Sequence, residues 1–398
     1  MYVNVAVLKE TQPHERRVAL VPSVAPKLMK LGAKLHMEAG AGEAIKLADS
    51  AFEDVAIVPD RHTLLADADV VLAVQAPAVG VVTAMKEGSV LISFIYPHKQ
   101  AALVKHLLER KITCFAMEQI PRITRAQEMD ALSSQAALAG YYAVLLGGAR
   151  LGRVFPKMTT AAGTVGPAKV LVMGLGVAGL ESLATAHRLG AVVEGYDVRP
   201  DTAEQAKSLG ATFVDTGVDA RGDGGYAREL TADEKVKVAA VLTKHIQAAD
   251  LIITTAAIPG RPSPKLISKK QVAGMKSGAV IVDLSAEGGG NCEDSVPGET
   301  TLVGAVTVMA PLNVPSLLGQ DASELYSKNV YNLLALMLKD NILTIDWKDE
   351  VLAKTVLTFA GDLKKDSSKK PAAPTPPPKK AGGKAHQGGA PIPGGSAR

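Results

Sequence analysis

The stretch of sequence that decides the fold is residues 169–199, KVLVMGLGVAGLESLATAHRLGAVVEGYDVR. The apolar run 170–173 stops at the glycine-rich turn 174–179, GLGVAG. A helical pattern follows this turn, and a second apolar run, 191–193, leads toward Asp197. This order of strand, glycine turn, helix, strand and acid is typical of a dinucleotide-binding unit.

The three glycines of this turn have separate expected roles. Gly174 allows a tight turn, Gly176 lets the backbone approach a pyrophosphate, and Gly179 lets the new helix pack closely on the strand. The first N–H groups and the positive end of that helix then bind the phosphates. A GxGxxG pattern alone is weak evidence, but here both flanking strands are present, and Asp197 follows Gly174 by 23 positions. The sequence therefore predicts a nucleotide site.

The residues at the end of the second strand indicate which nucleotide binds. A carboxylate at Asp197 can accept hydrogen bonds from the adenosine ribose and repels a 2′-phosphate, which favours NAD(H). Arg199 favours the opposite choice, because a guanidinium pairs well with a 2′-phosphate. Arg199 can also be a solvated surface charge or a side chain that stacks on adenine. We predict NAD(H) and keep NADP(H) as the alternative.

The composition describes a two-domain protein with a basic C-terminal end. A chain of 398 residues is long enough for two hydrophobic cores. The two cysteines, Cys114 and Cys292, show no disulfide or metal-binding spacing, and the N-terminal residues show no signal-peptide pattern. We therefore expect a cytoplasmic location and no metal. Residues 364–398 hold eight Lys or Arg and one Asp, a net charge of +7, so the total of +4 leaves −3 for residues 1–363.

Two segments of unusual composition need separate interpretation. The C-terminal segment 361–398 is rich in Pro, Lys, Gly and Ala, and we predict a disordered tail. Its charge has no interleaved aromatic residues, which argues against nucleic-acid binding. Residues 131–149 carry no charge over 19 positions, but serines, glycines and tyrosines dilute their hydrophobicity. We interpret residues 131–150 as a buried helix between two domains and not as a membrane span.

Alternation of short β-like and helical segments predicts two doubly wound, Rossmann-like α/β domains with a cleft between them. We expect the first domain to comprise residues 1–130 and about 325–360, and the nucleotide-binding domain to comprise residues 151–324. Besides the strands of the glycine motif, the expected strands are 3–9, 33–40, 69–77, 89–96, 112–120, 250–260, 279–287 and 301–306. The expected helices are 22–31, 61–67, 98–110 and 321–339.

Three polar segments are candidates for chemistry. The run 122–135, RITRAQEMDALSSQ, clusters charged, amide and hydroxyl side chains where a strand leaves the first sheet. Asp130 and Ser133 share a face once a helix begins, so the run either contacts a ligand or caps the helix and forms interdomain salt bridges. Residues 9–20 form a polar loop that we interpret as a solvated turn. Residues 222–227, GDGGYA, suit a mobile flap, unless their tyrosine is an ordinary core residue.

Together these segments resemble a known family. LKETQPHERRVALVP, PRITRAQEMDALSSQAALAGY, MTTAAGTVGPAKVLVMGLGVAGL, GDGGYARE, TTAAIPGRPSPKLI, VIVDLSAEGGGNCE and the run NVPS at 313–316 are similar to the NAD(H)-binding component of proton-translocating nicotinamide nucleotide transhydrogenases. The resemblance covers roughly residues 1–340. It implies a homodimer that binds NAD(H) and lies on the inner face of the cytoplasmic membrane, docked on a membrane-spanning subunit and on an NADP(H)-binding beta subunit. Hydride then passes directly between the two nicotinamides, coupled to proton translocation.

The resemblance also implies the site residues. Those expected in catalysis are Arg122, Gln127, Asp130 and Ser133 near the nicotinamide and Tyr226 on the mobile loop that closes over the nucleotide, where Gly225 is expected to contact the cofactor. Those expected to contact the rest of the cofactor are Glu128, Met129, Gly174, Leu175, Gly176, Val177, Gly179, Asp197, Val198, Arg199 and Ala257. Ala257 departs from the family, which usually has leucine in TTALIPG, so one wall of the pocket is expected to be looser. The cofactors carry the chemistry, so no general acid or base is required.

Two alternative functions remain at this stage. Alanine dehydrogenases share the KE…ERRVALVP opening and the two-domain plan, and they reduce pyruvate with ammonia. Their pattern places a substrate-binding lysine where this chain has Gln75, and an amide cannot supply that charge. His98 could stand for their catalytic histidine, although an exposed loop histidine is the simpler interpretation. The second alternative is a nucleotide-binding sensor without turnover.

Overall fold

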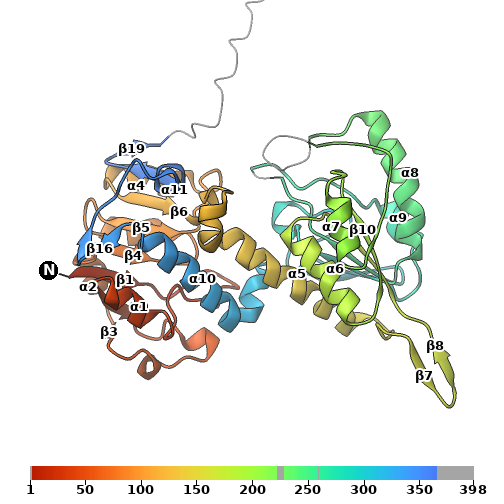
Figure 1. Ribbon diagram of the computed structural model, residues 1–398, viewed down its shortest axis with the longest axis horizontal. Helices are drawn as coiled ribbons and strands as arrows, with labels where there is room; N and C mark the ends of the chain where they lie inside the picture. The colour runs from red at the N-terminus through yellow and green to blue at the C-terminus, as the bar shows by residue number, and fades with distance from the viewer. Residues whose placement is uncertain (1, 222–227, 259, 365–398) are drawn as a thin grey trace, which may run out of the picture. The chain divides into compact units, whose positions relative to one another are not determined.

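The computed structural model describes residues 2–221, 228–258 and 260–364. The first of its two large sheets has the strand order β19-β18-β6-β5-β4-β1-β2-β3 (Figure 1). Strands β1 to β6 are parallel, and β18 and β19 extend the sheet in antiparallel fashion. The strands are β1 Val3–Val7, β2 Ala33–Glu38, β3 Ala56–Val58, β4 Val70–Leu72, β5 Val90–Ser93, β6 Thr113–Ala116, β18 Val356–Phe359 and β19 Asp362–Leu363.

Helices cover both faces of this sheet. In strand β1, Val5 and Val7 pack into one core with α1, α10 and α11, whereas Ala6 packs into a second core with α2, α3 and α4. A sheet that is buried on both faces needs nearly continuous apolar strands, which runs such as VNVAV and VLIS supply. The helices are α1 Ala25–Lys30, α2 Arg61–Ala66, α3 Val79–Ala84, α4 Ala101–Glu109, α10 Gly319–Leu334 and α11 Glu350–Thr355.

The second large sheet has the strand order β11-β10-β9-β12-β13-β15-β14, and of these strands only β14 runs antiparallel. One face packs on α5, α6 and α7 and the other on α8 and α9. The strands are β9 Lys169–Met173, β10 Val192–Tyr196, β11 Thr212–Phe213, β12 Leu251–Thr254, β13 Val280–Asp283, β14 Thr300–Val303 and β15 Val306–Met309. The helices are α5 Ala131–Arg150, α6 Val177–Arg188, α7 Thr202–Ser208, α8 Ala232–Ala248 and α9 Lys269–Ala273.

Both domains therefore have the doubly wound topology. Counted within each domain, the parallel strands follow the order 3-2-1-4-5-6, and the chain order reverses between β1 and β4 and between β9 and β12. The loops after these strands border the crevice in which doubly wound proteins bind ligands. The predicted class of two Rossmann-like α/β domains is confirmed, while the predicted cleft between the domains stays a prediction.

Helix α5 links residues of the two domains. Ala131 lies in the core of the first sheet, whereas Ala143 and Val144 lie in a core of the second sheet. Gly140 faces α6, where a Cβ atom would lie only 2.1 Å from the carbonyl oxygen of Ala178, so the missing side chain lets the two helices touch. Among the described residues, no helix is long and apolar enough to cross a membrane.

One predicted helix ends earlier than expected. Helix α10 starts at Gly319 and stops at Leu334, whereas the periodic pattern suggested helix over 321–339. The chain turns instead into the hairpin β16 Leu338–Lys339 and β17 Ile342–Leu343. Its two loop residues, Asp340 and Asn341, have positive φ angles of 50° and 63°, which is the conformation of a tight hairpin turn.

Two further segments complete the fold. β7 Met158–Thr160 and β8 Gly163–Val165 form a separate hairpin whose residues are all exposed. At the other end of the folded part, Asp362 and Leu363 pair with β18, so the first sheet continues beyond residue 361. Residues 365–398 lie outside the described residues, and the prediction of a disordered tail stays a prediction there.

Candidate functional site

The glycine turn after β9 has the geometry that the sequence predicts. Gly174 has φ +98°, and a Cβ atom there would lie 2.8 Å from the hydroxyl oxygen of Thr255. A Cβ atom at Gly179 would lie 1.8 Å from the carbonyl oxygen of Gly174, so only glycine lets α6 start so close to the strand. Around Gly176, by contrast, no described atom outside the residue and its two chain neighbours lies within 4 Å of the Cβ position. Two glycines therefore serve packing, and the third leaves open space beside the backbone.

The start of α6 presents backbone donors at this open space. Gly176 is the N-cap of α6, and among the described residues no side chain accepts a hydrogen bond from its first turn. Val177 is 43% exposed. The first N–H groups of a helix have no partner within the helix, and the helix dipole adds positive potential there. An anionic phosphate is the group that such a turn binds best.

Asp197 lies just beyond the end of β10 and is joined to the turn. Its Oδ2 atom accepts a hydrogen bond from the backbone N–H of Leu175 at 2.7 Å. Its carboxylate also forms a salt bridge with Arg199, at 2.8 Å between Oδ2 and Nη2. Val198, between these two residues, is partly buried against the core beneath α8. The predicted acid and arginine thus contact each other directly.

Asp283, to which the sequence pattern assigns no role, supports the neighbouring loops. This carboxylate is fully buried at the end of β13. It accepts hydrogen bonds from Thr254, Ser285, Asn291, Cys292 and Ser295. The side chain of Asn291 in turn bonds both the N–H and the carbonyl oxygen of Ala256, at 3.0 and 2.8 Å. The exposed Ala257 follows directly, so this network fixes the chain beside the predicted pocket wall.

The polar run 122–135 combines a short 3₁₀ helix, Thr124–Met129, with the cap of α5. The Asp130 carboxylate accepts hydrogen bonds from the N–H of Ser133 at 2.9 Å and from its hydroxyl at 2.6 Å. Asp130 therefore caps helix α5, which is one of the two predicted interpretations of this run. For the other polar residues of the run, ligand contact stays a prediction.

The remaining predicted residues of this run differ in exposure. Arg122, Gln127 and Glu128 have exposed side chains. Met129 is 6% exposed and packs in the core of the first domain. Its burial makes it a support for the run, with its side chain directed into protein. Gly225 and Tyr226 lie outside the described residues.

The polar loop 9–20 is not the solvated turn that we expected. Glu15 and Arg17 are buried and form a salt bridge of 2.6 Å. Arg17 also donates to the side chains of Gln135 at 2.8 Å and Asn313 at 3.1 Å. Burial by itself would raise the pKa of Glu15, but the hydrogen bonds and charge of Arg17 outweigh this effect and lower the pKa to about 2. The signal in the sequence was the apolar run at 18–21, which draws the loop into the core.

Gln75 belongs to the same buried cluster. Its Nε2 atom donates a hydrogen bond to Oε2 of Glu15 at 2.8 Å. The position where the alanine dehydrogenase pattern has a lysine is therefore an amide bound to a carboxylate of the protein itself. His98 is exposed and lies edge-on to the ring of Tyr96, with 6.4 Å between the ring centroids.

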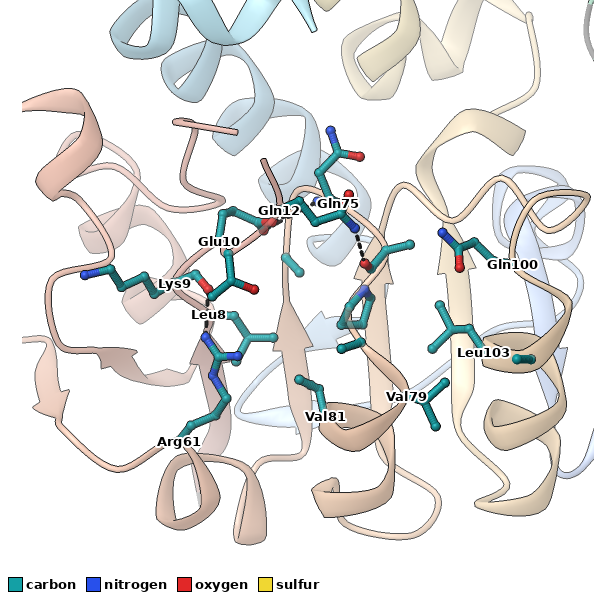
Figure 2. A pocket seen from close by; sticks show the side chains of 16 residues that line it. Leu8, Lys9, Glu10, Gln12, Arg61, Gln75, Val79, Val81, Gln100 and Leu103 are labelled. Carbon is teal, nitrogen blue, oxygen red and sulfur yellow. Dashed lines mark hydrogen bonds between the residues drawn. The ribbon is translucent and has the colours of Figure 1, made fainter. Parts of the chain in front are cut away.

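A small cavity of about 190 Å³ lies beside this cluster, at the ends of β1 and β4 (Figure 2). Glu10 lies in its wall and accepts a hydrogen bond from the N–H of Val74 at 2.6 Å. Burial raises the pKa of Glu10 to about 7, despite that hydrogen bond. Figure 2 shows Glu10, Gln12 and Gln75 close together on one side of the cavity. The first domain thus fills much of its crevice with its own side chains.

These features define a class: two Rossmann-like domains, of which the second carries an open glycine turn joined to an acid at the end of its second strand. The chain belongs to the alanine dehydrogenase/PNT family. The family's N-terminal domain matches residues 6–139 and its C-terminal domain matches residues 143–366.

Within this family, individual proteins show which members the chain resembles. The chain is 43% identical over 372 residues to an NAD(P) transhydrogenase alpha-subunit polypeptide of Rhodospirillum rubrum, an alignment that covers 90% of this chain and 97% of the relative. It is 30% identical over 300 residues to the alanine dehydrogenase of Mycobacterium tuberculosis, covering 74% and 76%. Among solved structures, the transhydrogenase from Sinorhizobium meliloti superposes with a TM-score of 0.80 at 39% identity, covering 90% of this chain and 98% of that one.

Proposed function

We propose that this chain is the NAD(H)-binding component of a proton-translocating transhydrogenase. It holds NADH while hydride passes directly to NADP⁺ on a partner component, and partner subunits couple this transfer to proton movement across the membrane. The observation that carries the proposal is the open turn at Gly176, with uncapped helix donors on one side and Asp197 on the other. The similarity to the Rhodospirillum rubrum subunit supports the same assignment.

The first domain argues against the alanine dehydrogenase alternative. Reduction of a keto acid needs cationic groups that hold the carboxylate and polarise the carbonyl. Here Gln75 is neutral, and the buried guanidinium of Arg17 is engaged by Glu15, Gln135 and Asn313. Hydride transfer between two nucleotides needs no such cation, because it requires only that the two C4 atoms meet at about 3–3.5 Å.

The nicotinamide side of the site is proposed to lie at the run 122–133. Gln127 has an exposed side chain on the 3₁₀ helix and can hold the nicotinamide or its ribose by neutral hydrogen bonds. Arg122 is proposed to contact the pyrophosphate or Asp130. Asp130 and Ser133 fix the start of α5 and hence the position of the preceding helix. The proposed loop over the nucleotide, with Gly225 and Tyr226, completes the site.

The assembly is proposed to be a homodimer that docks on a membrane-spanning subunit and an NADP(H)-binding subunit, on the cytoplasmic side of the membrane. Helix α5 supports a further contact, because it has no charge before Arg150 and yet leaves Tyr141 41% exposed. The exposed hairpin of β7 and β8, with Met158 43% and Val165 49% exposed, adds apolar surface.

One assay separates this proposal from the alternatives. The purified chain is given NADH with pyruvate and ammonia, and separately NADH with an NADP-binding partner component and an NADP⁺ analogue. We expect turnover only when the partner is present. Turnover with pyruvate and ammonia alone would overturn the proposal in favour of alanine dehydrogenase. NADH binding without turnover in either mixture would favour a sensor.

Replacing Gln127 tests the proposed positioning of the nicotinamide. Gln127→Asn shortens the side chain by one methylene but keeps the amide, so we expect hydride transfer to fall about tenfold to a hundredfold. The dissociation constant of NADH should change by no more than about twofold, because the phosphate and adenosine contacts remain. Gln247→Asn, at an exposed position on α8, is the matched control and should change neither quantity. Equal losses in transfer and binding would show that Gln127 only binds.

A further inference from the structure

The carboxylate of Asp197 is saturated by donors of the protein itself. Oδ1 accepts hydrogen bonds from the backbone N–H of Arg199 and from its Nε atom, both at 2.9 Å. Oδ2 accepts from Nη2 of Arg199 at 2.8 Å and from the N–H of Leu175 at 2.7 Å. Four donors thus occupy two oxygen atoms, which together offer about four acceptor sites.

The contact between these two side chains is a bidentate fork. Two parallel N–H···O bonds between a guanidinium and a carboxylate fix the plane of the guanidinium and are stronger than neutral hydrogen bonds. The Asp197 side chain is 7% exposed and that of Arg199 is 20% exposed, so water screens this pair only partly. The edge of the guanidinium formed by Nε and Nη2 is therefore held on the acid and is not available as a bidentate fork to another anion.

Separately, these two residues favour opposite cofactors. In general, a carboxylate at this position favours NAD(H), because it repels a 2′-phosphate, whereas an arginine pairs with that phosphate and favours NADP(H). Because Asp197 holds the fork of Arg199, a 2′-phosphate meets the carboxylate and does not meet a free guanidinium fork. Contact with Leu175 places the same acid on the phosphate turn, so the choice is made within the nucleotide site.

We infer that Asp197 and Arg199 act as one specificity pair, in which Asp197 rejects NADP(H) mainly by withholding Arg199 from the 2′-phosphate. This inference rests on the proposed binding of NAD(H) at the glycine turn. It assigns to Arg199 a latent affinity for NADP(H) that the neighbouring acid suppresses. For a component that must carry NAD(H) while its partner carries NADP(H), such suppression keeps the wrong nucleotide out of this site.

The test is a double-mutant cycle on the full-length chain, with dissociation constants of NADH and NADPH measured by nucleotide fluorescence. Asp197→Asn keeps an oxygen that can accept from Leu175 but loses the charge that holds the fork. We expect NADPH to bind at least about tenfold more tightly than to the wild type, as one new charge-assisted contact allows. In the double variant Asp197→Asn, Arg199→Ala, the gain for NADPH should disappear.

Two further variants make the cycle decisive. Arg199→Ala alone should leave NADPH binding as weak as in the wild type, because the guanidinium is already withheld there. Asp201→Asn removes a charge at an exposed position four residues later and should not raise NADPH affinity. Thermal unfolding checks that each variant is folded.

The inference would be overturned if Asp197→Asn gained no NADPH affinity, or if the gain survived in the double variant, since repulsion alone would then explain selectivity. It would also be overturned if Arg199→Ala alone weakened NADPH binding. Failure of the wild-type chain to bind NADH at all would contradict the proposed function instead, and so the two failures are distinguishable.

Discussion

The two domains contain the same crevice filled in opposite ways. In each sheet the strand order reverses between two strands, β1 and β4 in one domain and β9 and β12 in the other. After β9 the chain reads GLGVAG, and the backbone at Gly176 borders open space. After β1 it reads LKETQPHER, and Glu10 and Glu15 fill the crevice together with Arg17 and Gln75. One topology therefore gives an exposed backbone turn in one domain and, in the other, a crevice that side chains reduce to a small cavity of about 190 Å³.

The difference shows that the strand order creates a crevice in each domain, but the side chains around the crevice determine whether a ligand can bind there. At the glycine turn, helix donors are left for a ligand because no side chain caps them among the described residues. In the first domain, Arg17 and Gln75 donate to Glu15, which also accepts from Asn313 and Ser316. This cluster joins the loop 9–20 to the start of α5 and to the segment 313–318, so the crevice has become a structural joint.

Among the substitutions that test this difference between the domains, we expect the largest effect, a loss of stability, at Arg17. Arg17→Ala leaves the Glu15 carboxylate buried without its cation, and removal of one partner of a buried pair typically costs about 3–5 kcal/mol. Trp347, the only tryptophan of the chain, packs against Phe115 and Phe359 in the first domain, so its fluorescence reports unfolding of that domain. We expect the denaturant concentration at which the first domain of Arg17→Ala is half unfolded, measured by Trp347 fluorescence, to be lower than that of the wild type.

A matched control exists at the next residue. Arg16 has an exposed side chain, and Arg16→Ala should leave the Trp347 midpoint nearly unchanged. Below its own midpoint, Arg17→Ala should still bind NADH, because the glycine turn belongs to the other sheet. If Arg17→Ala were as stable as Arg16→Ala, the cluster would not be the joint that we describe.

The next effect in size is the pH dependence that Glu10 produces. Its pKa is raised from 4.5 to about 7, mainly by burial, so between these values the folded chain binds more protons than the unfolded chain. Stability from this group is therefore lost as the pH rises from about 4.5 to about 7, and the loss amounts to at most roughly 3 kcal/mol. Glu10→Gln removes the titration while keeping an oxygen that can accept from Val74.

The measurement is the thermal midpoint, followed by Trp347 fluorescence, of wild type and variant at pH 5 and pH 8. We expect the advantage of Glu10→Gln over the wild type to be larger at pH 8. Glu53→Gln, a change at an exposed position, serves as the control and should show no such difference. An advantage of Glu10→Gln that was the same at both pH values would contradict the raised pKa.

The features that could be predicted from the sequence are those whose interacting residues lie close together in the chain. The roles of Gly174 and Gly179 were predictable because the motif places the strand, the turn and the helix within a few residues of one another. The apolar run 18–21 indicated that the loop 9–20 meets the core, but the burial of Glu15 itself was not predictable, because its partners Gln75 and Asn313 lie 60 and 298 residues away in the chain. A polar loop without visible partners looks like a solvated turn.

The polar run shows the same limit at shorter range. A cap at Asp130 was one of two predicted interpretations, because its partner Ser133 is only three residues away. The burial of Met129 was not predicted, because it depends on how the run folds against the first-domain core. The short edge strand β3 was also not predicted, because three residues, AIV, carry too little pattern to be recognised. Local signals thus predicted the nucleotide turn, and tertiary partners decided the rest.

The smallest expected effect is at Gly176. It tests most directly whether the exposed turn of the second domain, unlike the filled crevice of the first, binds the nucleotide. The backbone angles of Gly176, φ −78° and ψ −167°, are allowed for any residue, and no described atom outside this residue and its chain neighbours lies within 4 Å of a Cβ atom placed there. Gly176→Ala should therefore fold normally but narrow the space beside the pyrophosphate, which we expect to weaken NADH binding by about tenfold, the equivalent of one hydrogen bond. Gly80→Ala is the matched control: it also has no described atom within 4 Å, but it lies on α3 of the first domain. Unchanged NADH affinity in Gly176→Ala would mean that the open backbone of the second domain is not where the phosphates bind.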